Sequence, residues 1–172
     1  ATGAVTNAND LGSIAITGAA TQGQTLSTTI TDPDGVPASG ITYQWKADGT
    51  NISGATSSTY TLTNAEVGKA ITVVANYTDS RSSPETVTSL ATGAVTNAND
   101  LGSIAITGAA TQGQTLSTTI TDPDGVPASG ITYQWKADGT NISGATSSTY
   151  TLTNAEVGKA ITVVANYTDS RS

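Results

Sequence analysis

The 172-residue chain contains no cysteine, no methionine, no histidine and no phenylalanine. Without cysteine there is no disulfide and no thiolate ligand for a metal, so packing alone must hold a folded domain together. Without histidine or cysteine the chain also lacks a Ser–His–Asp triad, a cysteine nucleophile and the usual ligands of zinc. Asp32 and Asp34 could be paired as hydrolase carboxylates, but no cleft-forming insertion accompanies them. We therefore predict that the chain is not an enzyme.

Basic residues are scarce. Six Lys and Arg residues stand against thirteen Asp and Glu residues, which gives a net charge of −7 at pH 7. Binding to phosphates requires clustered cations, and so does adhesion to an anionic membrane. No apolar run is long enough to cross a bilayer. We therefore expect no nucleic-acid partner and no direct membrane insertion.

What the sequence does contain is a repeat. Residues 91–172 repeat residues 1–82 letter for letter, so the period is 90 residues. A period of this length suits one small domain per repeat better than a solenoid unit, which cannot fold alone. The partner expected for each repeat is its identical neighbour in the same chain. We predict four segments: the end of a preceding repeat with a linker at 1–10, a first domain at 11–96, a linker at 97–100, and a second domain at 101–172 that lacks its last strand.

The apolar residues of each repeat alternate with a period of two. Ile41, Tyr43 and Trp45 fall on one side of a strand, and Asp48-Gly49 supplies a tight hairpin turn after it. Seven segments of this kind, separated by turns every 8–12 residues or so, predict an all-β fold of antiparallel strands in a Greek-key β-sandwich. The predicted strands are 13–18, 24–31, 41–45, a short strand at Ile52, 59–63, 70–78 and 85–95.

Two positions inside the repeat carry more specific predictions. Trp45 and its copy Trp135 are expected to fill the core between the sheets; the alternative is an exposed ring on which a sugar stacks. The polar segment 64–69 is expected to form a corner with one helical turn, for which Asn64 is the expected cap.

Several short motifs together resemble the bacterial Ig-like repeats of giant surface adhesins, including the RTX and biofilm-associated types. The resemblance covers essentially the whole repeat, and it implies tandem seven-stranded Ig-like domains at the bacterial cell surface, outside the cell. It also implies that the repeats are a structural extender, a stalk that projects a distal binding module. The alternative is a repeated carbohydrate- or protein-binding module that acts by avidity. The motifs are Tyr43-Gln-Trp45, Asp48-Gly49, Ile52-Ser-Gly-Ala-Thr56, Thr59-Tyr-Thr-Leu-Thr63, Ala65-Glu-Val-Gly-Lys69, Ile71-Thr-Val73 and Tyr77-Thr-Asp79.

The junction between the repeats is similar to that of cadherins, which bind calcium between successive domains through an Asp-Xaa-Asn-Asp-Asn linker. Here the linker reads Asn97-Ala-Asn99-Asp100-Leu101, and the corner Asn64-Ala-Glu66 stands where cadherins have Asp-Arg-Glu. The resemblance implies calcium at the junction. Because Asn97, Leu101 and Asn64 depart from the cadherin pattern, we expect one ion per junction and not three.

Topology gives an independent reason for these residues to meet. In such a sandwich the loops after the second and sixth strands lie at the end where the chain enters, and the corner before the sixth strand lies at the opposite end. Ca²⁺ takes about six to eight oxygen ligands. The alternative is that Asp-Pro-Asp-Gly is only a turn and Asn-Ala-Asn-Asp only a polar linker. The predicted ligands are Glu66, Asn97, Asn99, Asp100, Asp122, Asp124 and Asp169.

The second repeat has no counterpart of residues 85–95 within the 172 residues. Its strand at 160–168 is therefore expected to have an unpaired edge, whereas residues 1–6 are the tail of such a strand. We expect the two to meet between molecules, in a head-to-tail association.

Overall fold

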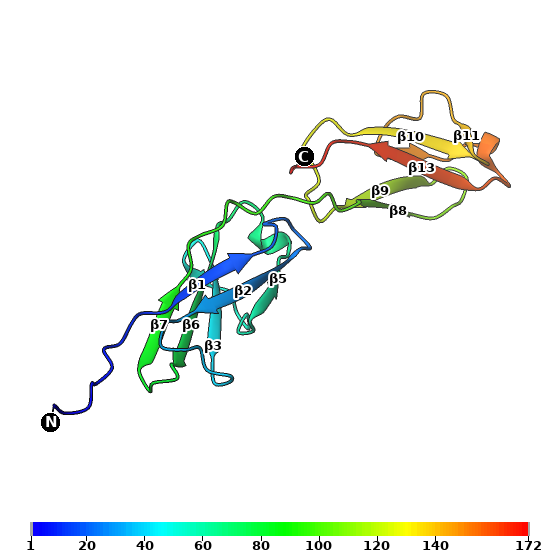
Figure 1. Cartoon of the computed structure of the whole chain (residues 1–172). Helices are drawn as coiled ribbons and strands as arrows, with labels where there is room; N and C mark the ends of the chain where they lie inside the picture. The colour runs from blue at the N-terminus through cyan, green and yellow to red at the C-terminus, as the bar shows by residue number, and fades with distance from the viewer. Residues whose placement is uncertain (1, 172) are drawn as a thin grey trace. The chain divides into compact units, whose positions relative to one another are not determined.

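A computed structural model describes residues 2–171, and the contacts within it divide the chain into two units (Figure 1). Unit 1 is Ala1–Ala98 and unit 2 is Asn99–Ser172. Apart from two short 3₁₀ turns, the regular structure of the described residues is β-strand. Within residues 2–171 we find no helix of the length and apolar character needed to cross a membrane.

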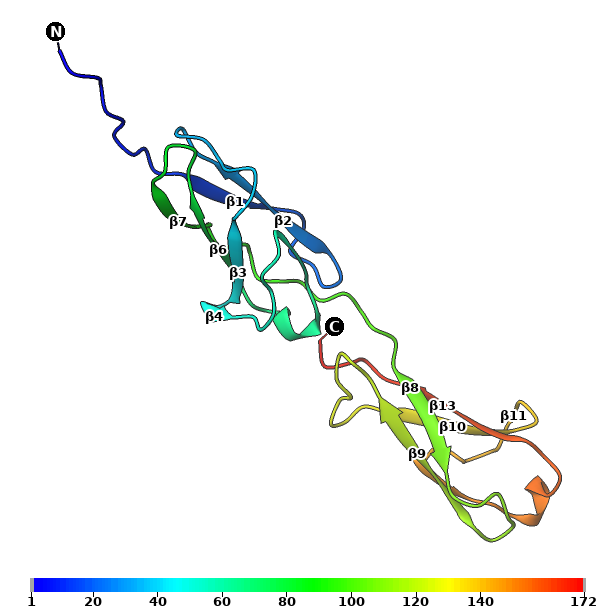
Figure 2. The same ribbon diagram turned by 90° about the horizontal axis from the view of Figure 1, so that it is seen from below.

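Unit 1 consists of two antiparallel sheets that face one another (Figures 1 and 2). The first sheet has the order β1-β2-β5, with β1 at Ser13–Thr17, β2 at Thr25–Thr31 and β5 at Thr59–Thr61. The second has the order β4-β3-β6-β7, with β4 at Thr50–Asn51, β3 at Thr42–Ala47, β6 at Ile71–Thr78 and β7 at Pro84–Thr88. The predicted all-β class and the antiparallel pairing are confirmed.

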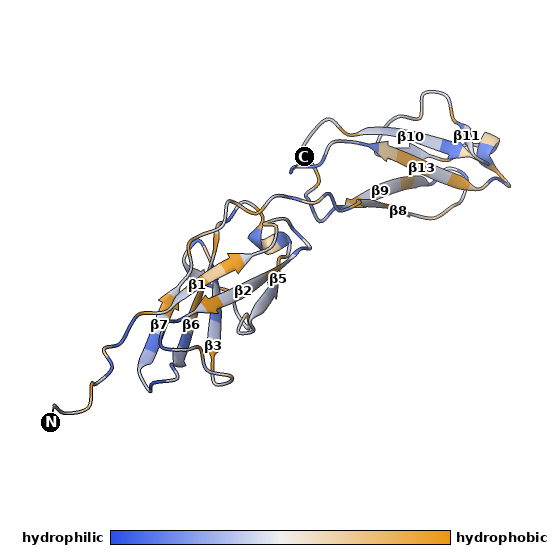
Figure 3. Cartoon of the chain, in the orientation of Figure 1, coloured by the Kyte–Doolittle hydropathy of each residue, from blue (hydrophilic) through white to orange (hydrophobic). Residues whose placement is uncertain are grey.

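Alternation of side chains explains why these segments form strands with one buried face. In β6, Ile71, Val73, Ala75 and Tyr77 are buried, while the residues between them are half-buried or exposed. Figure 3 shows apolar residues spread along the strands of both sheets. Trp45 lies opposite Val73 in the register of β3 and β6. Residues of both sheets pack in one core.

The prediction that both tryptophans lie in the core is confirmed. Trp45 and Trp135 have no exposed surface. The indole N–H of Trp45 donates a hydrogen bond of 2.9 Å to the carbonyl oxygen of Ser57, and Trp135 donates equally to Ser147. A ring this deeply buried cannot stack on a sugar.

The predicted hairpin turn after β3 is also confirmed. Asp48 and Gly49 both have positive φ angles, 45° and 79°. Such angles suit glycine and are tolerated by aspartate. The carboxylate of Asp48 accepts a hydrogen bond from the backbone N–H of Ala70, which ties the turn to the start of β6.

The cap of the corner differs from the prediction by one residue. The 3₁₀ turn at Asn64–Glu66 is capped by Thr63, not by Asn64. The hydroxyl of Thr63 accepts a hydrogen bond from the N–H of Ala65, while the carboxylate of Glu66 accepts from the N–H of Thr63 at 2.9 Å. This reciprocal capping box requires Thr and Glu three residues apart, and that spacing selects Thr63.

The predicted last strand at 85–95 is two separate pieces. β7 ends at Thr88, and isolated bridges then join Ala94 to Ala70, Val95 to Val67 and Thr96 to Thr21. The interruption has a local cause. The hydroxyl of Ser89 accepts from the N–H of Val73, and the hydroxyl of Thr92 accepts from the N–H of Ile71, so side chains replace backbone partners along β6.

Unit 2 repeats this arrangement with one difference. Its sheets have the orders β12-β9-β8 and β11-β10-β13, and within residues 99–171 β13 pairs only with β10, where β6 pairs with both β3 and β7. Ile71 and Val73 are fully buried in unit 1, but their counterparts Ile161 and Val163 are half-buried. The strands are β8 at Ser103–Thr107, β9 at Thr115–Thr121, β10 at Thr132–Ala137, β11 at Thr140–Asn141, β12 at Thr149–Thr151 and β13 at Ile161–Asn166.

Candidate metal centre

Three carboxylates meet at one end of unit 1. Asp32 follows β2, Asp79 follows β6 and Glu85 lies near the start of β7. A carboxylate oxygen from each lies within 4.8 Å of the others. Asp79 and Glu85 are buried, at 5% and 3% exposed, and Asp32 is half-buried. We call Asp32, Asp79 and Glu85 the acidic cluster.

Asp32 is held in place by two donors. The hydroxyl of Tyr77 donates to its Oδ2 at 2.7 Å, and the backbone N–H of Asp34 donates to its Oδ1 at 2.8 Å. Burial, followed by the hydrogen bond to this carboxylate, raises the pKa of Tyr77. Tyr77 therefore stays a neutral donor at neutral pH, and Asp32 is fixed as an acceptor beside the cluster.

Gly12 permits this arrangement. A Cβ atom at Gly12 would lie 1.9 Å from the hydroxyl oxygen of Tyr77 and 2.8 Å from Oδ2 of Asp32. We call residues 2–12, the segment before β1, the entering chain. At Gly12 its backbone approaches Tyr77 and Asp32 as closely as only glycine allows.

Asp79 has one satisfied and one unsatisfied oxygen. Its Oδ1 accepts from the backbone N–H groups of Arg81 and Ser83, each at 2.8 Å. Its Oδ2 is buried and has no hydrogen-bond partner. A buried acceptor without a partner is costly, and here it lies among other carboxylates. At an effective dielectric constant of about 20, two such charges less than 5 Å apart repel by on the order of 3 kcal/mol. A cation at this position would remove both costs.

The entering chain is bound to the acidic end by side-chain contacts. The amide of Asn9 donates to Oε1 of Glu85 at 2.7 Å. Oδ2 of Asp34 accepts from the N–H of Asp10 at 2.8 Å and from the amide of Asn7 at 3.1 Å. The hydrogen bond from the Asp10 N–H, then that from Asn7, lowers the pKa of Asp34. Linker residues are thus part of this end of the domain.

Asp34 already has a cationic partner. The guanidinium of Arg81 lies 3.2 Å from its Oδ1. Arg81 also donates to the side-chain oxygen of Asn7. Arg81 therefore forms its ion pair with Asp34, which is not a member of the acidic cluster.

In unit 2 the structure brings together three of the predicted ligands. The N–H of Asp100 donates to Oδ2 of Asp124 at 2.6 Å, and the N–H of Asp124 donates to Oδ1 of Asp122 at 2.8 Å. Asp124 is 1% exposed, and its Oδ1 is buried without a hydrogen-bond partner. Tyr167 donates to Asp122 at 2.7 Å, and this bond, with burial and then the charges of Asp122 and Asp169, raises the pKa of Tyr167. Asp169 is therefore close enough to act on the same tyrosine.

The other predicted ligands lie elsewhere. Glu66 is buried in unit 1, where its Oε2 accepts from the N–H and the hydroxyl of Thr63. Asn97 also belongs to unit 1, and its Oδ1 is buried without a hydrogen-bond partner. Asn99 is exposed in unit 2. That Glu66 and Asn97 meet the residues of unit 2 at one ion stays a prediction.

Sequence reasoning missed Glu85. The signal was present, because Glu85 and Val87 alternate with exposed residues along β7 and both are buried. Glu85 lies directly opposite Tyr77 in the register of β6 and β7. A carboxylate on the inward face of a strand is costly to bury unless it has a partner, so such a position is a candidate for a binding site.

Comparisons with known proteins identify no family. No protein-family model matches the chain, and no curated protein matches it. Among solved structures, the chain is similar to the three N-terminal domains of the bacteriophage RB49 Highly Immunogenic Outer Capsid protein (Hoc), with 16% sequence identity and a TM-score of 0.39. The match covers 90% of this chain and 58% of that one, so the chain spans little more than half the length of this neighbour.

Proposed function

We propose that the chain is part of the stalk of an extracellular bacterial surface adhesin, and that its repeats are seven-stranded Ig-like Greek-key domains stiffened by calcium. The observation that carries the proposal is the unsatisfied Oδ2 of Asp79, buried beside Asp32 and Glu85. The linker residue Asn9 binds Glu85 directly. An ion at the acidic cluster would therefore strengthen the attachment of the linker to the domain.

The character of the ligands favours Ca²⁺ over Mg²⁺. The site offers carboxylate oxygens from three side chains, two of them buried, and an all-oxygen ligand set suits a hard cation. Mg²⁺ usually keeps several of its waters and binds through one or two carboxylates, whereas Ca²⁺ takes about six to eight oxygens in a flexible geometry.

The repeat extends the proposal to the junction. The linker of unit 2 has the same letters as the entering chain of unit 1, and Asp122, Asp124 and Asp169 repeat Asp32, Asp34 and Asp79. The buried, unsatisfied Oδ1 of Asp124 supports an ion there as well. In this proposal Asn97, Asn99 and Asp100 supply linker ligands.

A stalk function also accords with the repetition. A spacer needs length and not variety, and identical units supply length. Without histidine and cysteine, the chain lacks the Ser–His–Asp and Cys–His arrangements of hydrolases.

Thermal unfolding of wild type and Asp79→Asn, each with Ca²⁺ and with chelator, tests the ion. In chelator we expect Asp79→Asn to melt at or above the wild-type temperature, because the substitution relieves repulsion and keeps the acceptor for Arg81 and Ser83. In millimolar Ca²⁺ we expect the order to reverse. Asp48→Asn, in the hairpin after β3, is the control and should respond to Ca²⁺ as the wild type does. A wild-type melting temperature that does not change with Ca²⁺ contradicts the proposal.

Small-angle scattering tests the stiffening separately. We expect a greater maximum dimension in millimolar Ca²⁺ than in chelator, and little change for Asp124→Asn. If Ca²⁺ binds but the two scattering profiles coincide, the ion stabilises domains without stiffening their connection.

A further inference from the structure

The turn after β2 directs its two carboxylates to different partners. Asp32 belongs to the acidic cluster, whereas Asp34 is paired with Arg81. The backbone N–H of Asp34 donates to Oδ1 of Asp32 at 2.8 Å, which fixes the two residues relative to one another. Asp34 is only 4% exposed, so its charge needs a partner close by. The chain supplies that partner from its own loop after β6.

Arg81 is held beside Asp34 through both its backbone and its side chain. Its backbone N–H donates to Oδ1 of Asp79, a member of the acidic cluster, at 2.8 Å. Its guanidinium lies 3.2 Å from Oδ1 of Asp34 and donates to the side-chain oxygen of Asn7. A guanidinium is always charged near neutral pH and carries donors only, so it gathers acceptor oxygens around a positive charge, as a metal ion does.

The copies of the two oxygens that Arg81 contacts have no hydrogen-bond partner. Oδ1 of Asn97, the copy of the Asn7 oxygen, is buried without a donor. Oδ1 of Asp124, the copy of the Asp34 oxygen, is also buried without a donor. A buried acceptor that lacks a partner is costly. In unit 1, Arg81 therefore satisfies oxygens of a kind that would otherwise attract a cation.

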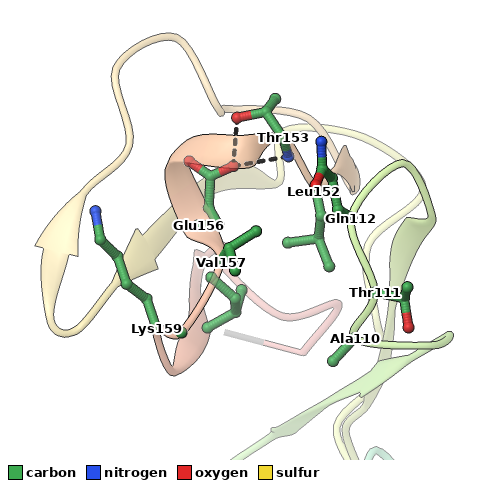
Figure 4. Close-up of a pocket in the computed structure, with 10 residues that line it drawn as sticks. Ala110, Thr111, Gln112, Leu152, Thr153, Glu156, Val157 and Lys159 are labelled. Atoms are coloured by element: carbon green, nitrogen blue, oxygen red, sulfur yellow. Dashed lines mark hydrogen bonds between the residues drawn. The ribbon is translucent and has the colours of Figure 1, made fainter.

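Burial of a carboxylate does not by itself leave such an oxygen. Figure 4 shows Glu156, at the corner of unit 2, whose Oε2 accepts from the N–H and the hydroxyl of Thr153 at 2.8 Å each. Glu156 is 8% exposed, and its donors come from the capping box itself. The need for a cation therefore arises at the acidic end of the domain and not at the corner.

We propose that Arg81 is a built-in cation: its guanidinium occupies a second ion-binding position, formed by Asp34 and Asn7, and so limits unit 1 to the ion of the acidic cluster. The inference rests on the proposed function, which places an ion at that cluster. Carboxylate and amide carbonyl oxygens are the two kinds that Arg81 contacts, and both are ligands of Ca²⁺. Removal of the guanidinium would leave them for a second ion.

The two positions hold the entering chain in different ways. At the acidic cluster, Asn9 contacts Glu85, and a bound ion strengthens this attachment. At the second position, Arg81 joins Asn7 to Asp34 without any ion. The entering chain should therefore stay partly attached to unit 1 when calcium is removed.

Counting the Ca²⁺ ions bound per chain, by isothermal titration calorimetry of metal-free protein, tests the proposal. Arg81→Gln removes the charge but keeps the backbone N–H that Asp79 accepts, and the side chain is 54% exposed, so the variant should fold. We expect it to bind one Ca²⁺ more than wild type. Arg81→Lys keeps a positive charge and should bind the wild-type number. Lys46→Gln, opposite Thr72 in β6 and far along that strand from Tyr77, removes the same charge elsewhere and should leave the number unchanged.

The double variant Asp34→Asn/Arg81→Gln should return to the wild-type number, because the additional ion depends on the carboxylate of Asp34. If wild type binds Ca²⁺ and Arg81→Gln binds the same number, or if the additional ion survives in the double variant, the role of Arg81 is wrong while the ion at the acidic cluster stands. If wild type binds none and Arg81→Gln binds one, the ion at the cluster is wrong while the second position stands. An absence of binding in both proteins would overturn both.

Discussion

The hydroxyl of Tyr77 donates a 2.7 Å hydrogen bond to the carboxylate of Asp32, and Tyr167 and Asp122 form the same bond at the same length in unit 2. The bond joins the end of β6 to the loop after β2, across the two sheets of unit 1. The same bond is present in unit 2, where, among residues 99–171, β13 pairs only with β10. The tyrosine–aspartate bond therefore does not depend on β7, whereas the third carboxylate of the acidic cluster, Glu85, lies on β7 itself.

Tyr77→Phe should reduce the loss of stability at alkaline pH. The pKa of Tyr77 is raised above its ordinary value of 10.0, first by burial and then by the bond to Asp32. A raised pKa means that the folded state favours the neutral phenol. The contribution of the neutral phenol to the free energy of unfolding is therefore complete below pH 10 and is lost as the pH rises further. We expect urea unfolding of Tyr77→Phe to show a lower stability at pH 8 but a shallower decline above pH 10. A decline as steep as that of wild type would show that Tyr77 does not titrate in this range.

Asp34→Asn should instead change how folding stability depends on pH in the acidic range. The pKa of Asp34 is lowered from its ordinary value of 3.8 by the N–H of Asp10, the amide of Asn7 and the charge of Arg81. A carboxyl group whose pKa is lowered by folding stabilises the folded state at pH values above its unfolded-state pKa. This stabilisation is lost as the pH falls through its folded-state pKa. We expect wild type to lose stability below about pH 4 and Asp34→Asn to lose less over the same interval. Asp48→Asn, remote from the entering chain, should keep the wild-type slope.

Gly12→Ala should destabilise unit 1 by about 1–3 kcal/mol, the usual range for an added group in a site with no room for it. The new Cβ would meet the oxygens of Tyr77 and Asp32. Gly3→Ala is the control, since nothing lies within 4 Å of the Cβ position there. Equal unfolding midpoints for the two variants would mean that the entering chain moves aside at low cost.

Much of the fold could be predicted because its signals are local. Alternation identified β3 and β6, and Asp48-Gly49 identified the turn between β3 and β4. The end of the last strand could not be predicted, because it depends on side-chain hydroxyls replacing backbone acceptors at Ser89 and Thr92. No local signal distinguishes a serine that does this from one that faces solvent.

In the candidate site, too, the residues marked by local sequence could be predicted and those defined by three-dimensional contacts could not. Asp32 and Asp34, and their copies, were identifiable as acidic turn residues, and topology indicated that they lie near Asp79. Glu85 was missed because its significance depends on facing inward beside Tyr77, a relationship set by the pairing of β6 and β7. The orientation of the second oxygen of Asp79, which carries the proposal of an ion, is a three-dimensional property.

The two units should unfold separately although their sequences agree. The core of unit 1 contains Ile71, Val73 and Val95 with almost no exposed surface, whereas Ile161 and Val163 are half-buried in unit 2. Less apolar burial means lower stability, by about 25 cal/mol for each Å² that stays exposed. At micromolar concentration we expect two calorimetric transitions, the lower one from unit 2. Trp135→Ala removes a fully buried ring, which costs about 3–5 kcal/mol, and should abolish the lower transition while the upper one stays. Trp45→Ala is the reciprocal variant and should lower the upper transition instead. A single transition that both variants shift equally would show that the two units unfold together, and that the difference in burial has no energetic consequence.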